Sequence, residues 1–125
     1  MGQRTMIAAA AFLAASFAIA PAFADSWGAI AYSPTTHATG YTWDNVNEVD
    51  AELRALQFCD ENASDCISAI TFQDACGAVA SGDGKGWGAD WAIDETIAQE
   101  LALQACYDHG NQNCKIVRWQ CSYVN

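Results

Sequence analysis

Gly28-Ala29-Ile30-Ala31 and Gly77-Ala78-Val79-Ala80 decide the fold, because they carry one pattern at two places 49 residues apart. Three further blocks recur in the same order at offsets of 47 or 48 residues: Gly40-x-x-Trp43 with Gly88-x-x-Trp91, Ala51-x-x-x-Ala55-Leu56-Gln57-x-Cys59 with Ala98-x-x-x-Ala102-Leu103-Gln104-x-Cys106, and Cys66 with Cys114. Two copies are too few for a solenoid. We therefore expect one domain with a pseudo-two-fold, whose first copy spans about 27–75 and whose second spans about 76–121.

Each copy is predicted to run strand, turn, strand, helix, strand, which gives an α+β fold. Turn residues, helix caps and alternating apolar residues place these elements in the sequence. The expected strands are 27–32, 40–43 and 67–72 in the first copy, and 77–80, 87–91 and 115–119 in the second, with 82–86 as a glycine-rich hairpin turn.

The two helices are expected to bury a stripe of large apolar residues. The first begins after a cap at Asn45 or Asn47, and the second begins after Asp94 and ends at His109-Gly110. Apolar residues at helical spacing form the expected stripes, with the neighbouring alanines beside them: Val49, Leu53 and Leu56 in the first helix, and Ile97, Leu101 and Ala105 in the second.

Six cysteines follow the repeat. Sequence alone leaves 15 pairings open, and the repeat favours Cys59 with Cys66, Cys106 with Cys114, and Cys76 with Cys121. Zinc is the alternative, but the cysteines lack the short spacing of zinc-binding motifs. We therefore expect a small domain held by three disulfides, in a compartment where disulfides persist.

The first 24 residues are typical of a secretory signal peptide. A positive start at Gln3-Arg4 precedes an apolar run over 6–20, and Ala22 and Ala24 form a cleavage site of the A-x-A type. An uncleaved membrane anchor is the alternative, although fifteen residues are short for a bilayer. Cleavage after Ala24 predicts a periplasmic or secreted protein, with 25–125 as its single mature domain.

The chain that follows residue 24 is strongly acidic. It holds 15 acidic side chains and four basic ones, which leaves a formal charge of −11. That charge repels nucleic acids and anionic membrane surfaces, and it suits a basic protein partner through electrostatic steering. A disordered acidic tail is excluded by the eleven aromatic residues in the same stretch.

The ordered blocks resemble a known family. Trp27 to Ser33, the alanine-rich helix that ends at Cys59, the segment 76–80, and Cys114 to Cys121 are together similar to the domain of unknown function 4189 family, DUF4189. The resemblance covers Trp27 to Cys121. It implies a small exported protein with a disulfide-rich α+β layout, and it implies no common activity and no catalytic motif. The acidic residues between Cys59 and Cys66 depart from the family pattern.

A binding surface is predicted from aromatic and acidic residues. On an extended strand Trp87 and Trp91 point to one face, and Tyr41 and Trp43 occupy the comparable face of the first copy. Such rings stack on sugars or receive a partner protein. Alternatively they fill the space that the strand alanines leave in the core. The remaining candidates are the acidic residues between two cysteines: Asp60, Glu61 and Asp65.

Catalytic chemistry has weak support in the sequence. Nucleophile-elbow, zinc-protease and phosphate-loop motifs are absent, His37 and His109 stand alone, and Asp83 lacks a calcium-ligand ladder. Several carboxylates are candidates for a glycosidase pair, although most lie at helix starts or on helix backs, where they cap, favour the helix dipole or solvate the surface: Glu48, Asp50, Glu52, Asp60, Glu61, Asp94 and Glu95. We expect a non-enzymatic binding module without cofactor or metal, of the inhibitor or immunity type. A glycan-binding or glycan-hydrolysing protein of the cell wall is the alternative, and a purely structural envelope protein is a third reading.

Overall fold

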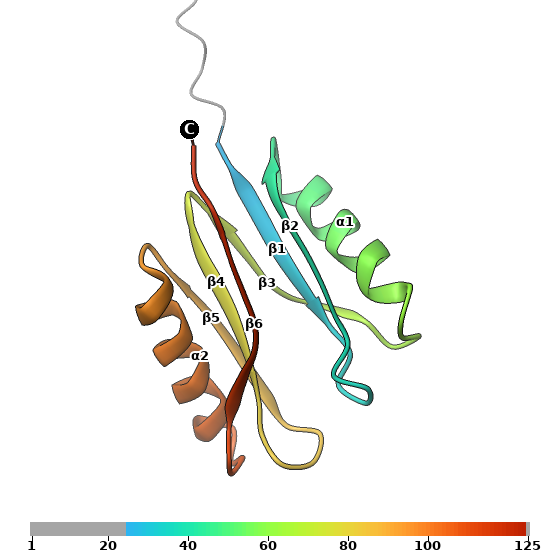
Figure 1. Cartoon of the computed structure of the whole chain (residues 1–125), viewed down its shortest axis with the longest axis vertical. Helices are drawn as coiled ribbons and strands as arrows, with labels where there is room; N and C mark the ends of the chain where they lie inside the picture. Colours follow the sequence, from blue (N-terminus) through green and yellow to red (C-terminus); the bar gives the residue numbers. More distant parts are fainter. Residues whose placement is uncertain (1–24, 125) are drawn as a thin grey trace, which may run out of the picture.

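The computed structural model describes residues 25–124 and arranges them in four layers, helix, sheet, sheet, helix (Figure 1). The expected signal peptide and its cleavage site lie outside the described residues. The elements follow one another in the order of the two copies: β1 (Trp27–Tyr32), β2 (Thr39–Asn45), α1 (Glu48–Asp60) and β3 (Ile67–Gln73), then β4 (Ala75–Ser81), β5 (Trp87–Ala92), α2 (Glu95–Asp108) and β6 (Lys115–Ser122). The α+β fold and the pseudo-repeat are therefore confirmed.

Each copy forms its own antiparallel sheet. The first strand of each copy is central, so that the strand orders are β2-β1-β3 and β5-β4-β6. β3 passes into β4 through Asp74, which adopts a φ of 48°. Its backbone N–H donates to Ser26 O over 2.9 Å and its carboxylate accepts from Ser26 N over 3.1 Å. This turn joins the two sheets at the start of β1.

Strand alternation separates the core into three clusters. On β1, Ala29 and Ala31 face α1, whereas Ile30 and Tyr32 face the second sheet. The second copy repeats this arrangement, and the buried residues against each outer helix are almost all small: Ala29, Ala31, Ala51, Ala55 and Cys59 against α1, and Cys76, Ala78, Ala80, Ala98, Ala102 and Cys106 against α2. The layer between the sheets holds the larger side chains, with Phe72 and Val79 at its centre.

The helices begin where capping predicts. Asn47, one of the two proposed caps, accepts from Asp50 N over 2.8 Å, and Asp94 accepts from Thr96 N and Ile97 N. α2 ends at His109, and Gly110 follows with a φ of 84°. These contacts satisfy backbone N–H groups that have no partner within the helix.

The expected helix stripes are wrong. Val49 and Leu53 are 64% and 54% exposed, Ile97 and Leu101 are also exposed, and the alanines beside them are buried instead. The physical reason is the close approach of each helix to its sheet. A Cβ atom on Gly40 would lie 2.1 Å from Ala55 O, so only small residues fit between α1 and the strands. The alternative in which the aromatic rings serve as core is confirmed in part, because Trp87 and Tyr41 pack against the cluster between the sheets, whereas Trp43 and Trp91 are exposed.

The three disulfides join the pairs that the repeat favours. Cys59 is bonded to Cys66 and Cys106 to Cys114, so that each helix end is tied to the strand that follows it. The third bond links Cys76 to Cys121 between neighbouring strands β4 and β6. Three disulfides are typical of proteins outside the cytoplasm, so we describe this protein as extracytoplasmic. Within residues 25–124 no helix is long and apolar enough to cross a membrane.

Candidate functional site

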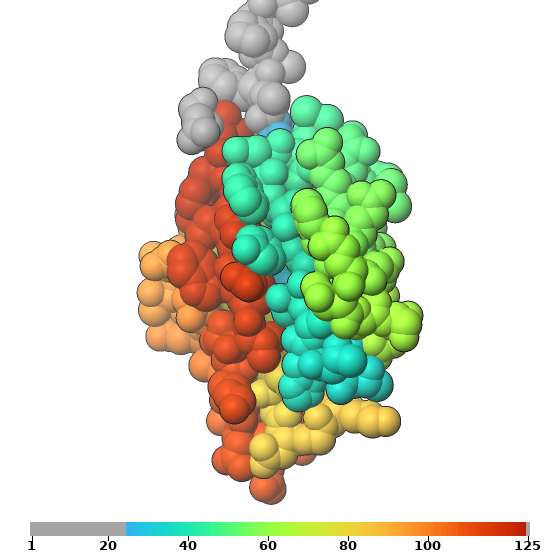
Figure 2. All heavy atoms as spheres, turned by 45° about the vertical axis from the view of Figure 1, so that its right-hand side comes forward, coloured from blue at the N-terminus to red at the C-terminus, as the bar shows by residue number. Residues whose placement is uncertain are grey.

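An open groove of the described surface lies between β2 and the second half of α1. It encloses about 650 Å³, and in Figure 2 it runs between the β2 surface at the centre and the α1 surface on the right. β2 forms its floor from Thr39 to Trp43, and α1 and the turn after it form a wall. The wall consists of three residues of α1 and two residues that follow it: Arg54, Gln57 and Phe58, then Glu61 and Asn62.

The floor of the groove is set by the two faces of β2. Gly40 and Thr42 face α1, and the Thr42 hydroxyl donates to Ala51 O over 3.1 Å, which fixes the strand against the helix. Tyr41 and Trp43 point to the opposite face, with ring centroids 6.1 Å apart and planes 19° from parallel. Trp43 is 51% exposed. The groove therefore has an aromatic border along one side.

Arg118 of β6 holds this aromatic border in place. Its guanidinium carbon lies 4.1 Å from the centroid of the Tyr41 ring, at a distance where a cation and an aromatic face attract each other. The contact joins the edge of the first sheet to the second sheet. The Tyr41 ring of the first copy is thus held by a residue of the second copy, Arg118.

The wall of the groove combines apolar and charged groups. Phe58 is 50% exposed although it is one of the largest apolar side chains on α1. Arg54 lies one helical turn before it, and Glu61 caps the C-terminal end of the helix next to Asp60. Exposed apolar surface with a charged rim is a feature of many protein interfaces.

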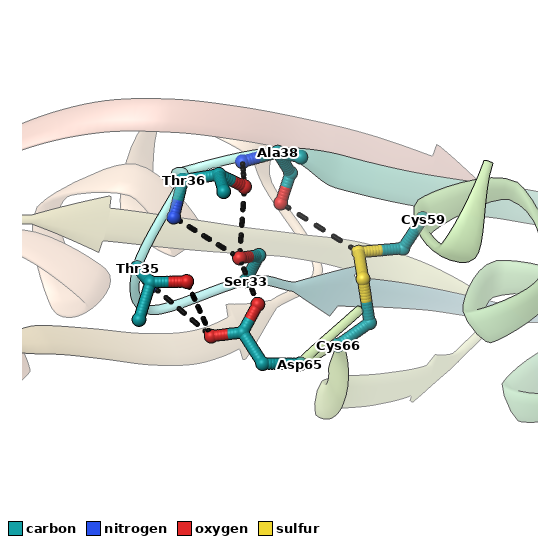
Figure 3. The surroundings of a disulfide bond; sticks show 7 residues. All are labelled: Ser33, Thr35, Thr36, Ala38, Cys59, Asp65 and Cys66. Atoms are coloured by element: carbon teal, nitrogen blue, oxygen red, sulfur yellow. Dashed lines mark hydrogen bonds between the residues drawn. A yellow bond between two sulfur atoms is a disulfide. The ribbon is translucent and has the colours of Figure 1, made fainter. Parts of the chain in front are cut away.

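Asp65 belongs to the fold and not to the groove. As Figure 3 shows, its carboxylate accepts hydrogen bonds from the Ser33 hydroxyl and from both the backbone N–H and the hydroxyl of Thr35. These bonds lower the pKa of the Asp65 carboxyl below its ordinary value. They tie the β1–β2 turn to the loop before Cys66. In the second copy the Asn113 amide donates to the Asp83 carboxylate over 2.6 Å, which ties the β4–β5 turn to the loop before Cys114 in the same way.

The predicted tryptophan pair of the second copy is divided between core and surface. Trp87 is half-buried between the sheets, where its ring centroid lies 5.7 Å from that of Tyr32. Trp91 is exposed and lines a smaller hollow with Trp27 and Phe72. Of the predicted binding residues, the structure brings together Tyr41, Trp43 and Glu61, with Asp60 beside them, and it places Trp87, Trp91 and Asp65 elsewhere.

The carboxylates proposed for a glycosidase pair make structural contacts. Glu48 accepts from the Thr71 hydroxyl over 2.9 Å and Glu52 accepts from the Ser68 hydroxyl over 3.2 Å, so both tie α1 to β3. Asp50 and Asp94 act in the helix caps. Among residues 25–124 no three His, Cys, Asp or Glu side chains gather as a metal site. His37 lies exposed in the β1–β2 turn, stacked on Tyr32 with centroids 6.0 Å apart.

Four residues in the wall of the groove were missed by sequence reasoning: Arg54, Gln57, Phe58 and Asn62. The signal that identifies two of them is the comparison of the copies. At the offset of 47 residues, Leu101 corresponds to Arg54 and Ala105 corresponds to Phe58, and Ala89 takes the place of Tyr41 at the offset of 48. The glycines and alanines that hold each helix close to its sheet recur in both copies, whereas Arg54, Phe58 and Tyr41 are replaced in the second copy. Their identity is therefore not required by the strand-strand-helix-strand unit.

These features define a class of small α+β domains in which two copies of one unit pack sheet against sheet and are closed by three disulfides. The chain belongs to the DUF4189 family, a domain of unknown function, whose family model matches residues 27–121. The resemblance seen in the sequence is thereby confirmed over most of the chain. Among curated proteins and solved structures no match to the chain was found.

Proposed function

We propose that this protein is an exported, acidic, non-enzymatic module that binds a basic envelope or secreted protein through the groove between β2 and α1. In this proposal residues 1–24 are a signal peptide cleaved after Ala24, and the oxidised domain acts in the periplasm or the medium. An inhibitor or immunity protein against a cationic hydrolase of the cell wall is one concrete form of it.

The observation that carries the proposal is the exposed aromatic and apolar lining of the groove. Trp43 and Phe58 leave about half of their side-chain surface in contact with water, which is costly unless the surface is covered for part of the time. Aromatic side chains in a concave surface are typical of the residues that dominate binding energy in protein interfaces.

Charge favours a basic partner. The formal charge of −11 raises the rate at which a cationic protein meets this surface and disfavours acidic competitors. Glu61 places part of that charge at one end of the groove. Such an interaction weakens as salt is added, because the Debye length falls from about 10 Å at 0.1 M to about 3 Å at 1 M.

Binding of a cell-wall glycan is the second candidate. The half-exposed ring of Trp43 beside Tyr41 favours it, because flat aromatic faces stack on sugar rings. Hydrolysis has less support than binding, since four of the candidate carboxylates serve in helix caps or tie α1 to β3: Glu48, Asp50, Glu52 and Asp94.

Affinity capture at two salt concentrations tests the proposal. The oxidised protein is immobilised and exposed to cell envelope and to culture medium, and the bound material is washed at about 0.05 M and about 1 M salt. We expect a basic protein retained only at low salt, which then rebinds after purification. A partner held equally at both concentrations contradicts the electrostatic part of the proposal. Retention of purified cell wall without any protein favours the glycan candidate.

A further inference from the structure

β2 is an edge strand whose outer side is open. It pairs with β1 alone, and the strand order of its sheet is β2-β1-β3. Residues Thr39 to Thr42 pair with β1 in regular register, and the irregularity begins only opposite Trp27. Every second residue of such a strand directs its backbone N–H and C=O groups away from its partner strand. These groups are available to another chain.

From Thr39 to Thr42 this edge carries none of the features that usually prevent strand addition, because the bulge of β2 comes later, at Trp43 and Asp44, where Asp44 adopts a φ of 59°. Natural edge strands carry lysine, proline or a bulge to prevent pairing with other chains. Between Thr39 and Trp43 the sequence Thr-Gly-Tyr-Thr-Trp contains neither lysine nor proline. The same five residues form the floor of the groove. The open backbone edge and the concave surface therefore coincide.

We propose that the groove takes an extended segment of the partner protein, which adds to β2 as a fourth strand of the first sheet. This inference rests on the proposed function and names its mode of binding. The regular part of β2, Thr39 to Thr42, spans about 13 Å at 3.3 Å per residue, so the added strand has about four residues in contact. Main-chain hydrogen bonds supply affinity in this mode, and pockets for alternate side chains supply specificity.

The wall of the groove specifies the chemistry of that segment. Phe58 and Glu61 are three residues apart on α1, which places their side chains about 5–6 Å apart on one face of the helix. Alternate residues of a strand lie about 6.6 Å apart on the same side. The segment that fits has an apolar residue packed on Phe58 and a lysine or arginine two positions away, against Glu61.

Synthetic octapeptides test strand addition directly. An array presents capped octapeptides with an apolar and a basic residue two positions apart, each beside a scrambled peptide of the same composition. The affinity of the best peptide for the oxidised protein is measured by fluorescence anisotropy. The peptide is then remade with N-methyl groups on one alternate set of backbone amides, and separately on the other set. N-methylation of the set that bonds to β2 is expected to raise Kd at least tenfold, and N-methylation of the other set to change it little.

Two exposed residues provide a matched pair of variants. Phe58→Ala removes a groove residue and introduces the side chain found at the equivalent position of α2, so the helix tolerates it. Ile97→Ala removes an apolar side chain that is also 50% exposed but lies on α2, away from the groove. We expect Phe58→Ala to raise the Kd of the peptide at least tenfold, and Ile97→Ala to leave it unchanged.

The outcomes separate this inference from the proposed function. Strand addition is overturned if every octapeptide binds more weakly than about 1 mM, if the two N-methylated forms bind alike, or if Ile97→Ala weakens binding as much as Phe58→Ala does. If a folded basic partner binds in a salt-dependent way and loses affinity with Phe58→Ala while the peptides fail, the proposed function stands and strand addition falls. If neither the partner nor the peptides bind, both fall.

Discussion

Replacing Gly40 by alanine is expected to destabilise the protein by about 3 kcal/mol or more. The added Cβ would lie 2.1 Å from Ala55 O and 2.3 Å from the Cys59 backbone nitrogen. Both are backbone atoms of α1, so no side-chain rotation relieves the clash and the helix must move outward by about 1 Å. A gap of 0.5–1 Å forfeits about a quarter to a half of the dispersion attraction between the surfaces that separate.

The cost follows from what α1 contacts. Small residues fill the interface between α1 and the first sheet, and all of them lose contact together when the helix shifts. Overpacking of a core costs about 1–3 kcal/mol when side chains can adjust, and here the obstacle is backbone. In a domain of this size about 3 kcal/mol corresponds to a fall in Tm of about 12 °C or more.

Guanidinium unfolding of the oxidised protein, followed by tryptophan fluorescence, measures the change in unfolding free energy. Gly88→Ala is the matched variant, because its Cβ would lie 2.2 Å from the Cys106 backbone nitrogen in the second copy. Gly84→Ala is the control: Gly84 has a φ of 80° and open space around it, so alanine there costs only about 1 kcal/mol. If Gly40→Ala costs no more than Gly84→Ala, the close approach of α1 to β2 is not what excludes larger side chains.

Three further predictions concern pH, aromatic packing and a disulfide. Hydrogen bonds lower the pKa of Asp65 in the folded state, so its stabilisation is present above the unfolded-state pKa of about 3.9 and is lost as the pH falls through the lower folded value. Asp65→Asn should therefore lower Tm at pH 7 and not at about pH 2, and an equal difference at both pH values contradicts this. Trp87→Ala should cost about 3 kcal/mol and Trp43→Ala less than about 1 kcal/mol in denaturant unfolding, because only Trp87 packs between the sheets; similar costs would contradict the assignment. Replacing Cys76 and Cys121 together by alanine should cost about 4 kcal/mol, since that bond closes 45 residues, and a loss below about 1 kcal/mol would show that it adds little constraint.

Much of the fold can be predicted from the sequence, because each strand and helix of the first copy has a counterpart at the equivalent position of the second copy. β1 begins and ends at the predicted residues, and the cysteine pairs follow from equivalent positions. Which face of α1 is buried does not follow in this way. Hydrophobic periodicity favours Val49 and Leu53, and only the distance between helix and sheet, set by Gly40, reverses that preference.

The candidate site is predicted less well than the fold. Tyr41 and Trp43 are found because alternation on a strand places them on one face. Phe58 is not found, because its exposure depends on how α1 is seated on the sheet. The contacts of Asp65 are not found either, since the turn that it holds comes from residues about 30 positions earlier in the chain.

The most direct test of the central claim, that the groove between β2 and α1 binds the partner, is the affinity of the purified partner for a variant that combines Arg54→Leu and Phe58→Ala. These changes give α1 the residues that α2 has at the equivalent positions, and both original side chains are exposed. We predict an affinity at least tenfold weaker than that of the unaltered protein, equivalent to about 1.4 kcal/mol, with Tm unchanged. An affinity equal to that of the unaltered protein would contradict the account and place the binding surface elsewhere.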